Sequence, residues 1–162
     1  SSSRGLGDVY KRQISTSPGR IEIDVLKALN KKQVQKFDYE EIQSRLTEID
    51  ENVDKKFWDT IKGNLETVEE ISSWTDIVFN SKPAESDDKD YIKLALELMP
   101  EEPWDDDTWT TWTNAIKEKT GRKGKELFLP LRVAFTGLTH GPEMKLLIQL
   151  IGRDKIVERI QT

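Results

Sequence analysis

The stretch "LFLPLRVAFTGLTHGPEMKLLIQLIGRDK", from Leu127 to Lys155, contains two apolar helical patterns joined by the short loop Thr136–Pro142. Apolar residues recur there every three or four positions, which is typical of amphipathic helices. Gly137 is suited to end the first helix in the left-handed conformation, and Pro142 to occupy the first position of the second. The stretch therefore predicts a helical hairpin. Free backbone N–H groups at the second helix start suit a phosphate or base edge, although a tight connection alone also explains the loop.

Arg132 stands among the apolar residues of this stretch. On a helical wheel with Phe128 at zero, Arg132 falls at roughly 40°, beside the apolar face. A half-buried guanidinium needs a partner. One interpretation is an internal salt bridge with Glu143 or Glu158. The other is a planar cationic fork directed at a nucleic-acid base or phosphate. Both interpretations are open on the sequence alone.

The rest of the chain also shows helical rather than strand periodicity. A first pattern begins at Glu22 and can end at Asn30, and Asp38 with Glu41 has capping-box spacing before the next helix. A third helical region is interrupted at Gly63-Asn64, where a bend or break is expected. Sustained alternation of apolar and polar residues is missing from the sequence, so the predicted fold class is all-α.

Three segments suggest how the chain is divided. Residues 1–13, "SSSRGLGDVYKRQ", have no helical or strand period and are expected to be a flexible leader introduced by cloning. The polar stretch Asn80–Asp88, which contains Pro83, is the best candidate for a linker. We therefore predict a first helical subdomain over residues 14–82 and a second over residues 83–162.

The composition narrows the function. The chain has 162 residues, a net charge of −5, a mean hydropathy of −0.66 and no cysteine, which excludes disulfides and thiol chemistry. No apolar run is long enough to span a membrane. The charge is uneven: residues 1–37 have 8 Lys and Arg against 3 Asp and Glu, and residues 111–162 have 10 against 5. Uneven surface charge is common, yet basic ends can still present a positive face to phosphate.

The candidates for catalytic or metal-binding chemistry have simpler explanations. His140 is the only histidine, so a zinc site lacks ligands, and we predict no metal site and no catalytic residue. Tryptophans at helical spacing, including Trp109 and Trp112, favour core packing over base stacking. An acid cluster precedes that helix, and helix capping explains it better than calcium binding. The acid cluster consists of Glu101, Glu102, Asp105, Asp106 and Asp107.

One combination of motifs resembles a known family. "ELFLPLRVAFTGLTHGPEMKLLIQLIGRDKIVERI" closely resembles the C-terminal end of bacterial glutamyl-tRNA synthetases, with matches at Pro130-Leu131-Arg132, Thr136-Gly137, Gly141-Pro142-Glu143 and Leu150-Ile151-Gly152-Arg153. "LKALNKKQVQKFDYEEIQSRL", "FWDTIKGNLETVEEISSW" and "EPWDDDTWTTWTNAIKEKTGRKGKELF" are also similar to segments of that family. The resemblance covers about residues 16 to 161. The ATP-binding signatures of the catalytic half do not occur.

The resemblance implies an all-α cage of two small helical subdomains that holds a tRNA anticodon loop. It implies a cytoplasmic, monomeric fragment that binds tRNA without cofactor, whereas the parent ligase would use ATP and Mg²⁺ to attach glutamate to tRNA. Steering of the phosphates is expected from Lys117, Lys119, Arg122, Lys123 and Lys125. The implied tRNA-binding residues are Asn64, Asn114, Lys123, Arg132, Gly141, Pro142 and Met144.

Asn64 bears on tRNA selection. Family members that reject tRNA-Gln often carry an arginine at the corresponding position, and a short uncharged amide should discriminate less well. The resemblance thus suggests a relaxed parent enzyme that accepts tRNA-Glu and tRNA-Gln, although Asn64 can also be only a helix-end residue. Two alternatives to tRNA recognition are a helical protein-interaction module without RNA binding and, less favoured, a hydrolase that uses the acid cluster.

Overall fold

The computed structural model describes residues 30–80 and 86–161. Residues 30–36 are helical, and shorter turns of other helix types occur at Lys62–Asn64, Val68–Glu70 and Asp76–Asn80. No strand occurs in these ranges, and the all-α prediction is confirmed. The α-helices are α3 (Tyr39–Ile49), α4 (Lys55–Ile61), α5 (Ile71–Thr75), α6 (Lys89–Glu97), α7 (Thr108–Thr120), α8 (Lys125–Thr136), α9 (Met144–Ile151) and α10 (Arg153–Gln161).

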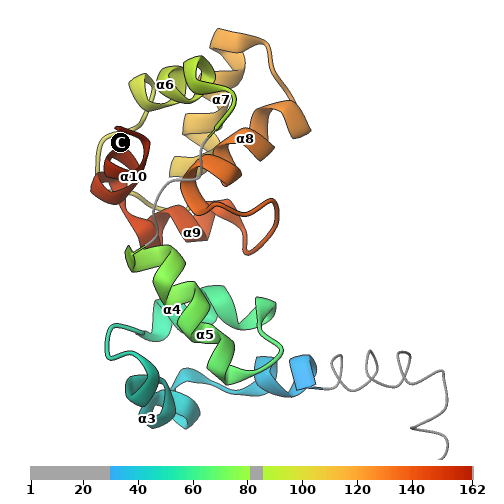
Figure 1. Cartoon of the computed structure of the whole chain (residues 1–162), viewed down its shortest axis with the longest axis vertical. Helices are drawn as coiled ribbons and strands as arrows, with labels where there is room; N and C mark the ends of the chain where they lie inside the picture. Colours follow the sequence, from blue (N-terminus) through green and yellow to red (C-terminus); the bar gives the residue numbers. More distant parts are fainter. Residues whose placement is uncertain (1–29, 81–85, 162) are drawn as a thin grey trace, which may run out of the picture.

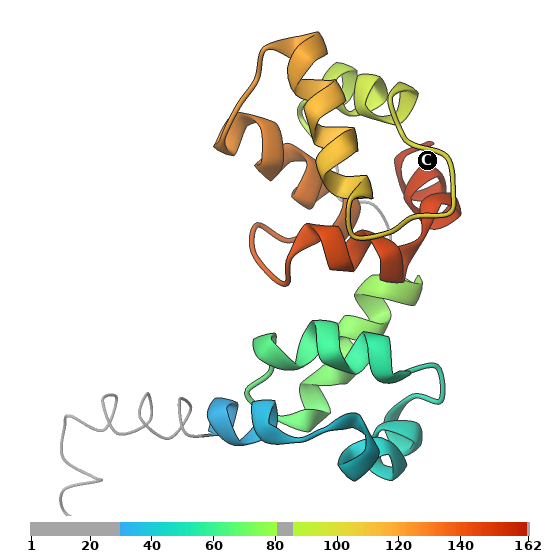
Figure 2. The same ribbon diagram turned by 180° about the vertical axis from the view of Figure 1, so that it is seen from behind.

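The helices form two small bundles stacked along the long axis of the molecule (Figures 1 and 2). Residues 30–80 form one bundle and residues 86–161 the other, which confirms the arrangement of two helical subdomains. α9 lies at the junction and contacts α4 of the first bundle. The expected boundary at residues 82–83 and the leader at residues 1–13 lie outside the described residues. The subdomain limits therefore stay a prediction.

The structure confirms some of the helix starts and ends that were predicted for the first subdomain and contradicts others. The expected helix from Glu22 lies outside the described residues up to residue 29, but Asn30 itself is helical and does not end a helix: residues 30–36 form one, and the buried Val34 anchors its last turn to the core. Asp38 does precede α3, but its side chain makes no capping hydrogen bond, and the first turn is closed instead by the backbone N–H of Glu41 bonding to the Asp38 carbonyl at 3.1 Å. The break at Gly63-Asn64 is confirmed, since a 3₁₀ turn ends there and Leu65 is extended.

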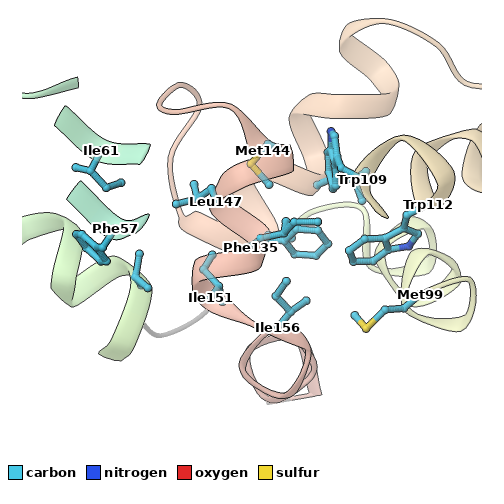
Figure 3. Packing of buried hydrophobic residues seen from close by; sticks show 14 of the residues in the cluster. Phe57, Ile61, Met99, Trp109, Trp112, Phe135, Met144, Leu147, Ile151 and Ile156 are labelled. Atoms are coloured by element: carbon cyan, nitrogen blue, oxygen red, sulfur yellow. The ribbon is translucent and has the colours of Figure 1, made fainter. Parts of the chain in front are cut away.

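The core of the second subdomain is built from aromatic side chains. The rings of Trp112 and Phe135 stack with centroids 5.3 Å apart, and Trp109 meets Trp112 edge-on at 5.8 Å. The buried indole N–H of Trp112 donates to the Ala95 carbonyl at 2.8 Å, which satisfies its only polar atom. Figure 3 shows Leu147 of α9 between this cluster and the first subdomain. The predicted core role of these tryptophans is confirmed.

A buried arginine joins the two subdomains. Arg159 of α10 donates hydrogen bonds to the carbonyls of Phe135 at 2.8 Å, Ile77 at 2.6 Å and Val78 at 2.8 Å. The π-helical turn Asp76–Asn80 displaces its carbonyls from the usual helical pairing, so acceptors are available there. Lys155 reinforces the junction by donating to a carbonyl of the same turn. Burial lowers the pKa of Arg159, yet a guanidinium stays charged.

Among residues 30–80 and 86–161, no helix is both long and apolar enough to cross a bilayer.

Candidate nucleic-acid interface

An open pocket of about 490 Å³ lies where α7, α8 and the start of α9 meet. Its apolar wall includes Phe128, the one large hydrophobic side chain that is exposed among the described residues, at 44%. Three of its lining residues are cationic and one is acidic. The pocket is therefore both apolar and positively charged, a combination suited to a planar anionic ligand. Its lining consists of Trp109, Thr110, Lys125, Phe128, Leu129, Arg132, Thr139, Glu143, Met144 and Lys145.

Arg132 lines this pocket, and no side-chain partner of it lies among residues 30–80 and 86–161. Its Nη1 atom is buried and has no hydrogen-bond partner within the described ranges. Neither expected salt bridge accounts for it: Glu143 contacts Lys145 at 3.6 Å, and Glu158 acts on the neighbouring Arg159. Burial lowers the pKa of Arg132 but leaves it charged. A partly desolvated guanidinium that has an unused donor thus belongs to a side chain that lines a ligand-sized space.

The helical wheel placed Arg132 correctly but misjudged Phe128. Leu131 and Phe135 are buried, whereas Phe128 is exposed and turns into the pocket with Arg132, one helical turn later. Residues four apart lie on one face of a helix, so the phenyl ring and the guanidinium share a wall. This face carries an aromatic surface beside a cation, which suits stacking and hydrogen bonding to a base.

The loop between α8 and α9 approaches Arg132 at a glycine. A Cβ on Gly141 would lie 3.2 Å from Nη1 of Arg132 and 3.1 Å from Cη2 of Trp74, on α5 of the first subdomain. Contacts that short leave no room for a side chain without displacing a neighbour. Trp74 was not predicted as a site residue, because no sequence pattern pairs a residue of the first subdomain with this loop.

The ends of the loop differ in how well they were predicted. Gly137 ends α8 in the left-handed region, with φ 77° and its N–H bonded to the Val133 carbonyl at 2.8 Å, as expected. Pro142 does not begin the next helix. Glu143 has ψ 129°, so the backbone stays extended one residue longer and α9 begins at Met144. Met144 is buried and lines the pocket, while Pro142 is buried beneath the loop and does not line it.

The other expected site residues lie at different distances from the pocket. Asn114 is exposed one helical turn after Thr110, a lining residue, and Lys123 is exposed two residues before Lys125, another lining residue. Neither residue lines the pocket itself. Asn64 is also exposed, but it ends a turn of the first subdomain and does not line the pocket. The structure thus gathers most expected residues on the second subdomain and leaves Asn64 apart.

Arg122 was expected to steer phosphates, and its contacts contradict this. Its Nη1 donates to Asp88 at 2.6 Å, and its guanidinium lies 3.8 Å from the ring centroid of Tyr91. The hydrogen bond to Asp88 is the main reason that the pKa of Arg122 is raised. Nη1 also approaches the Glu126 carbonyl, which Pro130, lacking an N–H, leaves unpaired. Arg122 is therefore structural, while the remaining four expected lysines are exposed and are Lys117, Lys119, Lys123 and Lys125.

Of the acid cluster that was expected to cap α7, Asp105 does so, whereas the side chain of the N-cap residue Asp107 makes no capping hydrogen bond. The Asp105 carboxylate accepts from the backbone N–H of Asp107 at 2.9 Å and of Thr108 at 3.1 Å, and the Thr108 hydroxyl accepts from the Asp105 N–H at 2.9 Å. This reciprocal pairing satisfies donors at the helix start. Three of the other carboxylates contact α9 and α10: Asp106 accepts from Gln149, Glu101 pairs with Arg153 at 3.7 Å, and Glu102 accepts from the backbone N–H of Arg153 at 3.4 Å.

The family described as anticodon binding domain matches residues 24–162. The chain belongs to the anticodon-binding domain family. Curated relatives of this chain include glutamate–tRNA ligase 2 of Gluconobacter oxydans (strain 621H), 37% identical over 150 residues that cover 91% of this chain and 33% of that protein. A second is glutamate–tRNA ligase 2 of Ehrlichia canis (strain Jake), 41% identical over 149 residues, covering 90% and 33%. The chain spans about a third of the length of the relatives it matches.

Solved structures agree on the fold of the anticodon-binding chain. Glutamate–tRNA synthetase from Elizabethkingia anophelis superimposes with a TM-score of 0.67 at 19% identity, over 83% of this chain and 30% of that one. The resemblance to glutamyl-tRNA synthetases that the sequence motifs carried is thereby confirmed.

Proposed function

We propose that this chain is the anticodon-recognition part of a glutamate–tRNA ligase, and that the pocket around Arg132 binds anticodon bases. The observation that carries the proposal is Arg132, which lines a space of about 490 Å³ and whose buried Nη1 has no hydrogen-bond partner among the described residues. A base edge presents the acceptors that such a donor lacks. Unpaired RNA bases are usually recognised through hydrogen bonds to their edges and stacking on their faces.

The surroundings of Arg132 supply the other elements of RNA recognition. Phe128 offers an exposed ring surface for a base, and the buried ring of Trp109 packs behind it with its centroid 6.5 Å away. Lys125 and Lys145 line the same pocket and provide cations for the phosphates. The net charge of −5 does not oppose binding, because charge acts locally over about one Debye length. Asn114, Lys123 and the Gly141-Pro142 loop would extend the interface around the pocket.

The parent protein would attach glutamate to tRNA. Activation of glutamate with ATP and Mg²⁺ would belong to the remaining two thirds of such an enzyme, since the relatives are about three times longer than the matched region. The residues of this pocket would bind and orient the anticodon loop only. We further propose that the protein acts as a monomer in the cytoplasm and, because Asn64 replaces a cationic fork with a neutral amide, accepts tRNA-Gln as well as tRNA-Glu.

Filter binding of the full 162-residue chain to tRNA-Glu, tRNA-Gln and an unrelated tRNA tests the proposal. We expect measurable binding to the first two, at least about tenfold weaker binding to the third, and an affinity that falls steeply with salt. Equal affinity for all three would reduce the interaction to nonspecific electrostatics. Absence of binding at low salt would favour the protein-interaction alternative.

A further inference from the structure

Trp74 brings the first subdomain to the edge of the pocket in the second. Its Cη2 atom and the Nη1 atom of Arg132 approach the same side of Gly141, at 3.1 and 3.2 Å from the position that a Cβ would take. Trp74 is half-buried on α5, whereas Arg132 and Gly141 belong to α8 and the loop that follows it. The indole edge, the glycine and the guanidinium therefore form one packed contact.

This contact accounts for how Arg132 keeps its place. Within the described ranges its buried Nη1 makes no hydrogen bond, and only desolvation perturbs its pKa. A long side chain without polar anchors keeps one conformation only if neighbouring atoms fill the alternatives. Nη1 and the indole edge of Trp74 both lie against Gly141, so Gly141 and Trp74 bound the space around the guanidinium on the side of the loop and the first subdomain. An indole adds no acceptor, so it restricts the guanidinium without occupying its donors.

The junction between the subdomains supports Trp74 in this position. α5 leads directly into the π-helical turn Asp76–Asn80, and two carbonyls of that turn accept hydrogen bonds from Arg159. Arg159 also bonds to the carbonyl of Phe135, on the helix that carries Arg132. The backbones that bear Trp74 and Arg132 are thus tied to one buried group, which makes a fixed indole-to-guanidinium distance physically reasonable.

We propose that Trp74 is a positioning residue for Arg132, so that the first subdomain contributes to base selection in the pocket of the second. The inference rests on the proposed function, because it assigns the pre-organised guanidinium to anticodon bases. Holding a recognition group in its bound conformation lowers the cost of ordering it. Loss of Trp74 should therefore weaken the contact with a base, while the contacts with phosphates stay unchanged.

A double-mutant cycle tests the proposal. Trp74→Leu, Arg132→Ala and the double variant are titrated with the tRNA-Glu anticodon stem-loop and with the same stem-loop carrying three altered anticodon bases. We expect Trp74→Leu to weaken binding of the natural stem-loop about 3- to 10-fold, to narrow its preference over the altered one, and to leave the salt slope unchanged. In the Arg132→Ala background the same substitution should change affinity less than about twofold.

The matched control is Trp104→Leu. Trp104 is also half-buried, but its indole bonds to the Pro100 carbonyl and it does not line the pocket. We expect its stem-loop affinity to match the wild type. Helix content is measured first by circular dichroism, and if Trp74→Leu is not folded, Trp74→Phe completes the cycle with a smaller side-chain change. An effect of the Trp74 variant that is equal in both Arg132 backgrounds, or absent in both, overturns the inference. If the wild type does not prefer the natural stem-loop, the proposed function itself fails.

Discussion

Arg132→Met should separate binding from stability. The substitution removes the guanidinium and keeps an unbranched apolar stem against Trp74 and Gly141. Because Nη1 has no partner among the described residues, the folded protein loses no hydrogen bond of that atom. A buried donor left unsatisfied costs about 1–3 kcal/mol, part of which the variant recovers. We therefore expect the free energy of unfolding to stay within about 1 kcal/mol of the wild type, or to rise.

The same variant should bind RNA much less well. A lost contact between an arginine and a base weakens binding by about 1–3 kcal/mol, which corresponds to an affinity about 5- to 150-fold lower. The phosphate contacts remain with Lys125 and Lys145, so the salt dependence of the residual binding should be close to that of the wild type. Fluorescence anisotropy with a labelled anticodon stem-loop measures both quantities, and urea unfolding measures the stability.

Arg159→Met is the matched control, since it makes the same substitution at an arginine of the second subdomain whose guanidinium has hydrogen-bond partners in the protein. Arg159 donates to three carbonyls, and its loss strands those acceptors at the junction. We expect the free energy of unfolding to fall by about 3 kcal/mol or more. If Arg132→Met destabilises the chain to a similar degree while its folded fraction binds RNA normally, Arg132 is a structural residue and the reasoning is refuted.

Three further predictions follow from other parts of the molecule. Burial raises the pKa of Tyr91 to about 12, and its hydroxyl donates to the Leu127 carbonyl at 2.7 Å. A tyrosine whose pKa is higher in the folded than in the unfolded state contributes its full stabilisation below about pH 10. The free energy of unfolding should therefore fall between about pH 10 and 12. Urea unfolding across that range should show a weaker dependence on pH in Tyr91→Phe, and an identical dependence would contradict the assignment. Gly141→Val should reduce stem-loop affinity at least about tenfold at unchanged helix content, because its side chain collides with Trp74, and wild-type affinity would remove the loop from the site. The wild type should bind tRNA-Glu and tRNA-Gln about equally, and the variant Asn64→Arg should prefer tRNA-Glu. A wild-type preference for tRNA-Glu of about a hundredfold, near 2.7 kcal/mol, would contradict the proposed relaxed specificity.

Periodicity and turn chemistry predicted much of the fold. The left-handed end of α8 at Gly137 and the break at Asn64 follow from local chemistry, and the structure has both. Asn30 is a weak stop signal, and the burial of Val34 on the same helix outweighs it. Pro142 suits a first helical position, but the extended backbone at the next residue delays the helix. Local preferences are worth about 1 kcal/mol each, so tertiary contacts can reverse them.

The candidate site depended more on contacts between distant residues. The helical wheel put Arg132 at the border of the apolar face, yet it could not choose between an ion pair and a free guanidinium. The wheel also could not show that Phe128 is exposed to solvent. Periodicity identifies the apolar face of a helix, but not which apolar residue of that face lacks a packing neighbour. Trp74 and Arg159 carried no sequence signal at all, since their roles arise only where the two subdomains meet. Arg122 was expected to steer phosphates, but its guanidinium donates a hydrogen bond to Asp88 and lies over the ring of Tyr91.

The affinity of the full chain for the anticodon stem-loop of tRNA-Glu, compared with the same stem-loop carrying three altered anticodon bases, tests the central claim most directly. Both RNAs have the same phosphates, so any difference reports the reading of bases. We predict that the wild type prefers the natural stem-loop at least about tenfold and that Arg132→Met loses most of this preference. Equal affinities of the wild type for the two stem-loops, or an undiminished preference in Arg132→Met, would contradict base recognition by this pocket.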